Sequence, residues 1–272
     1  MSKKYMLACG DSFTDPDFKS TLYPDHDCSY AKWPELLAQK MNISKVVNLG
    51  KSGASNNYIF DHAIDHILEN SDKIEIVAIG TTESWRFTPY DRYFINPVSN
   101  MRNNNDRSES IPEYHTAIYP FMEYLMANLV SKEHGEYMIR VMLRNYVRQV
   151  LRIQRLCKKL NIRLILSNLL GPFSWPPINA IAREHFDTTL TYDRNRAAEQ
   201  ILSAEGFYDV DPASFCGWPC FPQLGGKSPT DVVTGEFQQE AMTVGPKDGH
   251  PNKLGHIYIA DKLYEHITKN NL

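Results

Sequence analysis

Residues 8–14 read Ala8-Cys9-Gly10-Asp11-Ser12-Phe13-Thr14, and the apolar run that leads into them has the form of a buried parallel strand. Gly10 permits a tight or positive-φ turn where this strand ends, and Asp11 and Ser12 are both able to cap a helix that begins nearby. A serine in such a turn can be presented as a nucleophile, next to backbone N–H groups that stabilise negative charge on a substrate oxygen. On this motif alone, helix capping is the better explanation of both residues.

Apolar segments alternate with helical patterns along the chain. Strands are predicted at residues 5–9, 46–49, 74–80, 162–167 and 207–210. Helices are predicted at residues 33–41, 58–68, 121–130, 137–160, 194–203 and 255–267. The alternation predicts one α/β domain over residues 1–272, with three α/β/α layers around a central, mostly parallel five-stranded sheet.

Small or polar residues follow the predicted strands that end near residues 9, 49 and 80. Ligands of open α/β sheets bind outside the carboxyl ends of the strands, so these turns predict one shared site. Irregular segments around residues 87–119 and 211–246 interrupt the pattern. Long segments of this kind are often lids or binding loops, and surface elaboration explains them nearly as well.

The composition excludes several classes of function. A formal net charge of −3 with mixed charges gives no reason to expect a nucleic-acid partner. The chain shows no phosphate loop, dinucleotide fingerprint or metal-ligand spacing, so neither a cofactor nor a metal is expected. We find no secretory signal and no membrane-spanning stretch, and the 5 cysteines do not form an even disulfide set. A cytoplasmic protein with reduced thiols and no membrane partner is the expectation.

A second motif, Asp248-Gly249-His250-Pro251-Asn252, lies more than two hundred residues after the first. An early Gly-Asp-Ser and a late Asp/His pair resemble the SGNH, or GDSL-type, serine hydrolase family. The stretches that resemble its four blocks are Gly10-Asp11-Ser12, Asn48-Leu49-Gly50-Lys51-Ser52-Gly53, Gly80-Thr81-Thr82-Glu83 and Asp248-Gly249-His250. The resemblance implies a flavodoxin-like α/β/α fold and a hydrolase that needs no cofactor.

The resemblance also implies the roles of three residues. Ser12 would be the nucleophile, His250 the base that activates it, and Asp248 the acid that orients His250. Members of the family commonly carry two residues between this acid and the histidine, whereas only Gly249 separates them here. The shorter spacing changes which way the acid points, so a Ser/His dyad or another acid remains an alternative. His256, which lies nearby, is expected to pack or cap the following helix.

The resemblance also implies an oxyanion hole made of the backbone N–H groups of Ser12 and Gly53 and one side-chain donor. By resemblance that third donor stands at Thr82, where the family usually has asparagine. A threonine hydroxyl donates a single hydrogen bond and is shorter than an amide, so Asn56 or Asn57 is an alternative donor. A requirement for glycine in a tight turn would by itself also explain Gly50 and Gly53.

Four residues are candidate substrate contacts: Asp11, Asn56, Trp85 and Arg86. Arg86 either grips a carboxylate or phosphate of the substrate or pairs with a neighbouring acid, and the ion pair is the better supported reading. Trp85 either stacks on a sugar ring or packs an insertion onto the core.

These observations favour a serine esterase that removes a short acyl group, such as an acetyl group of a carbohydrate, through an acyl-enzyme on Ser12. A sugar O-acyltransferase would use the same residues and differ mainly in excluding water. A non-catalytic glycan-binding or structural module is the third reading, since the third block and the acid spacing both depart from the family pattern.

Overall fold

The chain forms a five-stranded parallel sheet with helices on both faces. The computed structural model describes residues 4–82, 86–90, 93–95, 132–169, 209–211, 213–216 and 239–272. The strands of the sheet are β1 (Tyr5–Cys9), β2 (Val46–Asn48), β3 (Ile74–Thr81), β6 (Arg163–Asn168) and β7 (Phe215–Cys216). Their order, β2-β1-β3-β6-β7, is that of a doubly wound sheet, and every neighbouring pair is parallel. The expected α/β fold class is therefore confirmed.

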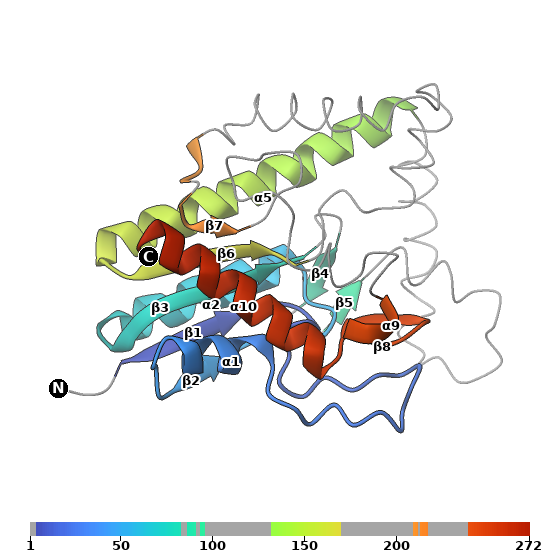
Figure 1. Cartoon of the computed structure of the whole chain (residues 1–272). Coiled ribbons are helices and arrows are strands. Elements are labelled where there is room, and N and C mark those ends of the chain that lie inside the picture. The colour runs from blue at the N-terminus through green and yellow to red at the C-terminus, as the bar shows by residue number, and fades with distance from the viewer. Residues whose placement is uncertain are drawn as a thin grey trace.

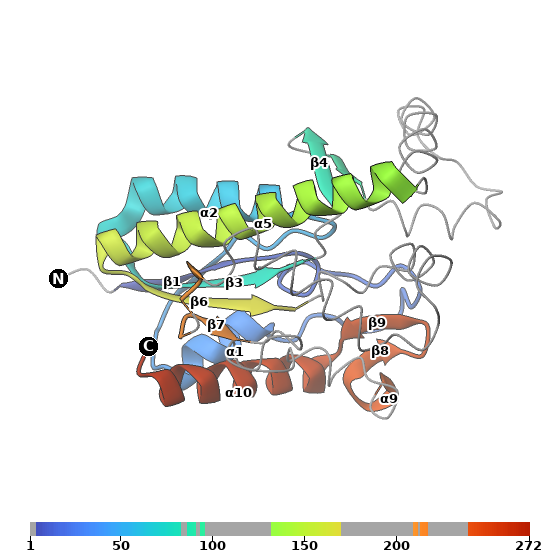
Figure 2. The same cartoon turned by 90° about the horizontal axis from the view of Figure 1, so that it is seen from above.

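The helices form two layers that enclose the sheet (Figure 1; Figure 2). Helices α1 (Trp33–Lys40) and α10 (Lys253–Asn270) cover one face, and α2 (Asn56–Asn70) and α5 (Lys132–Leu160) cover the other. Short helices η1 (Ser71–Lys73) and α9 (Gln239–Met242) lead into the strands that follow them. The helices predicted at 33–41, 58–68, 137–160 and 255–267 are confirmed, whereas those at 121–130 and 194–203 lie outside the described residues.

Alternate side chains of each strand enter two separate apolar cores. Leu7, Val77 and Leu164 stand side by side in register and pack beneath α2 and α5. The next row, which includes Ala78 and Ile165, packs beneath α1 and α10. Because both faces of the sheet are buried, its strands read as continuous apolar runs in the sequence.

The turn after β1 is packed against glycines from three strand ends. A Cβ on Gly10 would lie 2.1 Å from Oγ1 of Thr14, and one on Gly80 would lie 3.0 Å from the same oxygen. A Cβ on Gly50 would lie 2.6 Å from the Thr14 carbonyl carbon. Gly10 is therefore needed for this close approach. The glycine with a positive φ is Gly53, at 80°, in the turn after β2.

The helix expected near Ser12 is absent from residues 11–32, all of which the structure describes. Residues 11–14 form a turn in which the Asp11 carbonyl accepts the N–H groups of Thr14 and Asp15. Asp11 does cap this turn, because its Oδ1 accepts the Phe13 N–H at 3.0 Å. Pro16 follows at once, and the next helix begins at Trp33.

Two antiparallel hairpins lie within or beside segments that the sequence predicts to be irregular. One pairs β4 (Phe87–Tyr90) with β5 (Tyr93–Ile95), and the other pairs β8 (Thr243–Gly245) with β9 (Asp248–Pro251). The prediction of a strand at 207–210 is wrong for residues 209 and 210, which are not in a strand. The strand that pairs with β6 at the edge of the sheet is β7.

None of the helices in the described ranges has the length and apolarity needed to cross a membrane. The same ranges contain no cluster of three or more His, Cys, Asp and Glu side chains arranged to hold a metal ion. Cys9, Cys28, Cys157 and Cys216 are buried thiols, and Cys220 lies outside the described residues.

Candidate active site

The turn after β1 and the hairpin strand β9 bring Ser12 and His250 together. The Nε2 atom of His250 lies 2.8 Å from Oγ of Ser12, although 238 residues separate them. On the other side of the ring, Nδ1 lies 2.5 Å from Oδ1 of Asp248. The three side chains form a continuous hydrogen-bonded line from hydroxyl to imidazole to carboxylate. This is the geometry that a serine nucleophile, its base and an orienting acid require.

The short spacing between Asp248 and His250 works because both residues lie on a strand. Successive side chains of a strand point to opposite faces, so residues two apart point to the same face. Gly249 therefore separates the two without turning them away from each other. The expectation that the shorter spacing would misdirect the acid is wrong, because residues 248–251 form β9 rather than a loop.

Asp248 is 5% exposed, and its carboxylate is surrounded by donors. Oδ1 accepts both the backbone N–H and the ring nitrogen of His250, while Oδ2 accepts the hydroxyl of Ser20 at 2.5 Å. Burial raises the pKa of this carboxyl, but the hydrogen bonds from His250 and Ser20 outweigh it and lower the pKa to about 2. The carboxylate is therefore charged at every pH near neutrality.

The imidazole of His250 is packed between two aromatic rings. Phe18 stacks on it with ring centroids 4.3 Å apart and planes 27° apart, and Phe13 lies 5.2 Å away in a tilted arrangement. Phe18 belongs to a small apolar cluster with Cys28 and Val244, and Val244 is part of β8. The segment after Ser12 thus packs directly against the hairpin that carries Asp248 and His250.

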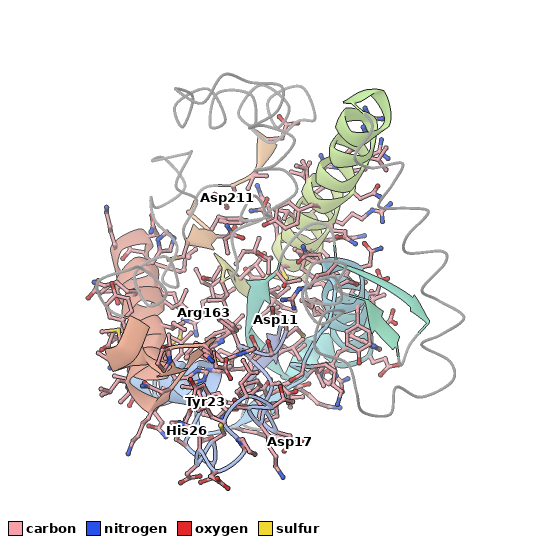
Figure 3. All side chains as sticks on the ribbon, turned by 90° about the vertical axis from the view of Figure 1, so that its right-hand side faces the viewer. Asp11, Asp17, Tyr23, His26, Arg163 and Asp211 are labelled. Carbon is pink, nitrogen blue, oxygen red and sulfur yellow. The ribbon has the colours of Figure 1, made fainter. Side chains whose placement is uncertain are left out.

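Asp11, expected to contact substrate, is instead at the centre of a buried network. Its carboxylate accepts the Phe13 N–H, the Thr82 hydroxyl at 2.7 Å and the Arg86 guanidinium at 3.1 Å. The Asp11 side chain is 0% exposed and that of Arg86 is 10% exposed. Figure 3 views the molecule from the side of the strand ends and shows Asp11 near its middle. Arg86 therefore pairs with a neighbouring acid, as the ion-pair reading expects, and Asp11 holds the turn that carries Ser12.

Two of the oxyanion donors expected on side chains, Thr82 and Asn56, donate hydrogen bonds within the protein. The Thr82 side chain is fully buried, and its hydroxyl donates its hydrogen bond to Asp11. It therefore does not act as the oxyanion donor that the sequence predicts. Asn56 exchanges two hydrogen bonds with the Thr82 backbone, at 2.8 and 2.9 Å, so its amide fixes the end of β3. Asn57, the other alternative, accepts a hydrogen bond from Gln149 at 2.6 Å. Trp85 lies outside the described residues.

The turn that contains Gly53 is bonded to both ends of the Ser12 turn. The Lys51 N–H donates to the Gly10 carbonyl at 2.9 Å, and Ser52 donates to Oδ2 of Asp15 through its N–H and its hydroxyl. These bonds place the second block beside the first. The backbone N–H groups of Ser12 and Gly53 consequently belong to adjacent turns.

Comparison with known proteins identifies the family. Residues 8–257 match the profile of the GDSL-like Lipase/Acylhydrolase family. The chain belongs to this GDSL-like family. It is accordingly a serine hydrolase of the esterase type, and the resemblance noted in its sequence is confirmed. No curated protein matches the GDSL-like chain significantly.

Solved structures similar to this GDSL-like hydrolase include a G-D-S-L family protein from Desulfitobacterium hafniense DCB-2. It is 15% identical with a TM-score of 0.43, and the match covers 97% of this chain and 99% of that one. Another is Axe2, an acetylxylan esterase from Geobacillus stearothermophilus, which is 18% identical with a TM-score of 0.40. That match covers 98% of this chain and 96% of Axe2.

His256 of the GDSL-like hydrolase has the packing role expected for it. It lies in the first turns of α10, is 1% exposed, and its Nδ1 accepts the Trp33 backbone N–H at 3.2 Å. Burial, with smaller contributions from the charges of Lys32 and His250, lowers the pKa of His256 to about 3. His256 is therefore a neutral acceptor that joins α10 to α1.

Sequence reasoning missed Ser20 and Phe18 in this GDSL-like hydrolase, although Ser20 contacts Asp248 and Phe18 contacts His250. They lie in the polar, proline-bearing segment 15–28, which contains no helix or strand. No periodicity marks either residue, and neither lies in a family block. The only signal in the sequence is their position shortly after Ser12.

Proposed function

We propose that this hydrolase cleaves a short-chain acyl ester through a covalent acyl-enzyme on Ser12. The observation that carries the proposal is the line from Ser12 Oγ to His250 Nε2 and from His250 Nδ1 to Asp248 Oδ1, at 2.8 and 2.5 Å. A serine hydroxyl is a poor nucleophile at neutral pH unless a base accepts its proton. The buried, charged Asp248 keeps the proton of the neutral imidazole on Nδ1, which leaves Nε2 free to be that base.

In the first half of the proposed reaction, Nε2 of His250 takes the proton of Ser12 as its Oγ attacks the carbonyl carbon of the ester. The carbonyl oxygen then carries a negative charge, which the N–H groups of Ser12 and Gly53 stabilise. Collapse of this tetrahedral intermediate breaks the bond to the alcohol oxygen, which leaves with the proton from His250. In the second half, His250 deprotonates a water that attacks the acyl-serine, and Ser12 regains its proton as the acid is released.

The proposed oxyanion hole relies on these two backbone donors. The Thr82 hydroxyl and the Asn56 amide act one step behind them, since they hold Asp11 and the end of β3 in place. Removing an oxyanion donor from a serine hydrolase typically costs about 2.7–4 kcal/mol of transition-state stabilisation. We therefore expect turnover below that of relatives with an asparagine at the third block.

The alcohol that we propose is a carbohydrate hydroxyl, with acetyl as the acyl group. The side chain of His250 is 31% exposed, so a ligand from solvent can reach it. The family description covers acyl esters in general, and a short acyl group is the reading that we test first. No cofactor or metal enters the proposed reaction.

The test compares p-nitrophenyl acetate, butyrate and octanoate with acetylated xylo-oligosaccharide as substrates of the wild type and Ser12→Ala. We expect the wild type to release acetate and to prefer the acetyl ester, and Ser12→Ala to be inactive. Mass spectrometry after a fluorophosphonate reagent should find one adduct, on Ser12. Equal activity of the two proteins, or inactivity of both, would refute the catalytic assignment, and an acylated sugar product would favour the transferase.

A further inference from the structure

Ser20 lies on the opposite side of the Asp248 carboxylate from His250. Its Oγ is 2.5 Å from Oδ2, while the imidazole is 2.5 Å from Oδ1. Ser20 and Asp248 are each 5% exposed, so water has little access to this bond. The Ser20 Oγ also accepts the Tyr23 backbone N–H at 2.9 Å, which directs its own hydrogen towards the carboxylate. The hydrogen-bonded line from Ser12 therefore continues through the acid to Ser20 and the Tyr23 backbone.

A carboxylate bonded on one side only can rotate about its Cβ–Cγ bond, because that torsion has broad wells. Rotation of Asp248 would take Oδ1 out of line with Nδ1 of His250. The Ser20 hydroxyl opposes this rotation, since it engages the second oxygen. Phe18, two residues earlier, stacks on the imidazole itself. One short segment therefore contacts both partners of the acid–base pair.

We propose that Ser20 is a positioning residue that holds Asp248, and through it His250, in line for proton transfer from Ser12. The inference rests on the proposed function and assigns to Ser20 a role outside the four family blocks. It also supplies a physical reason for the tolerance of the short acid spacing. Asp248 and His250 lie on a two-stranded hairpin, and segment 18–20 contacts both of them from outside that hairpin.

A purely structural role is the alternative, in which Ser20 only accepts the Tyr23 N–H and shapes a turn. Ser214 offers a matched control for that role. Its hydroxyl also accepts one N–H, from Gln154 at 2.7 Å, and donates to one carbonyl, at 3.2 Å, and it is likewise 5% exposed. It precedes β7, the edge strand that β3 and β6 separate from β1.

The experiment measures kcat, KM and the pH profile of kcat/KM on p-nitrophenyl acetate for Ser20→Ala, Ser20→Thr and Ser214→Ala. We expect Ser20→Ala to lower kcat about 10-fold with little change in KM, because a hydrogen bond to a charged group is lost. The acidic limb of its profile should move to higher pH, since a carboxylate with one donor fewer attracts the imidazole proton more strongly. Ser20→Thr should restore much of kcat, and Ser214→Ala should leave both kcat and the limb unchanged.

Two further measurements separate this inference from the proposed function. In an Asp248→Asn background, Ser20→Ala should cause no additional loss, because the two residues act through one bond. Proton NMR should show the downfield Nδ1–H resonance of His250 in the wild type and its broadening in Ser20→Ala, without reference to any substrate. Wild-type kcat, pH limb and resonance in Ser20→Ala, with Ser12→Ala inactive, would overturn this inference alone. Activity in Ser12→Ala would overturn the proposed function and this inference with it.

Discussion

In the proposed reaction, the carboxylate of Asp248 determines which nitrogen of His250 accepts the proton of Ser12. Asp248→Asn would place an amide donor next to Nδ1, which favours the tautomer protonated on Nε2 and blocks acceptance from Ser12. We expect kcat on p-nitrophenyl acetate to fall on the order of 10⁴-fold, as in other triads with this substitution. The spacing alone predicts a milder loss than in His250→Ala. The 2.5 Å contact instead predicts severe losses in both, and a loss below 10-fold would contradict it.

The buried Arg86–Asp11 ion pair, next to Ser12, is expected to contribute to the stability of the fold. Arg86→Met leaves a carboxylate with 0% exposure without its cation, and removing one partner of a buried pair typically costs about 3–5 kcal/mol. We expect urea denaturation to show a lower free energy of unfolding by about 3 kcal/mol. Lys262→Met, which breaks the exposed pair with Glu265, is the control and should change it little. Similar effects of the two substitutions would contradict the importance of the buried pair.

At the level of elements, the turns after β1, β2 and β3 fit together only because glycine occupies the contact points. A Cβ at Gly50 would lie 2.6–2.8 Å from backbone atoms of Thr14 and Asp15, which cannot move without shifting the Ser12 turn. Gly50→Ala should therefore destabilise the fold by about 1–3 kcal/mol and lower kcat, as measured by thermal unfolding and ester hydrolysis. Gly249→Ala is the control, because no atom lies within 4 Å of its added Cβ, and equal effects would refute the packing argument.

The elements of the sheet are predictable because burial on both faces produces apolar runs, as in β3. Strand β9 is different, since Asp-Gly-His-Pro has neither apolar character nor strand propensity. It is extended because Thr243 and Gly245 of β8 pair with Pro251 and Asp248. Such a strand depends on a partner formed elsewhere in the chain, so single-sequence reasoning assigns it to a loop. The direction of Asp248 could not be predicted for the same reason.

At the level of the whole molecule, the neutral His256 between α10 and α1 makes stability depend on pH. Its pKa in the folded state, about 3, is below the ordinary value near 6.5, so the unfolded chain binds a proton that the folded chain does not. This contribution is present above pH 6.5 and is lost as the pH falls towards 3. Between pH 7 and pH 5 the loss is about 2 kcal/mol. Urea denaturation at these two pH values checks it, and His256→Gln should show a smaller difference.

The candidate site was predictable in part, and the part that was not has a common cause. Ser12, Asp248 and His250 stand in motifs, whereas Ser20 and Phe18 act through contacts that only the folded chain creates. The donor expected at Thr82 could not be predicted for the same reason, because its hydroxyl donates to Asp11, which follows the neighbouring strand β1. Motifs report the identities of reacting groups, and tertiary packing decides which neighbours orient them.

The pairing of residue 12 with residue 250 also has a meaning for the order of events during synthesis. Ser12 leaves the ribosome 238 residues before His250, the base that we propose for it. Until β9 has docked beside the first turn, the serine has no partner to remove its proton. In the proposed reaction, the nascent chain therefore carries an unactivated hydroxyl, and hydrolytic activity arises only when β9 lies beside it.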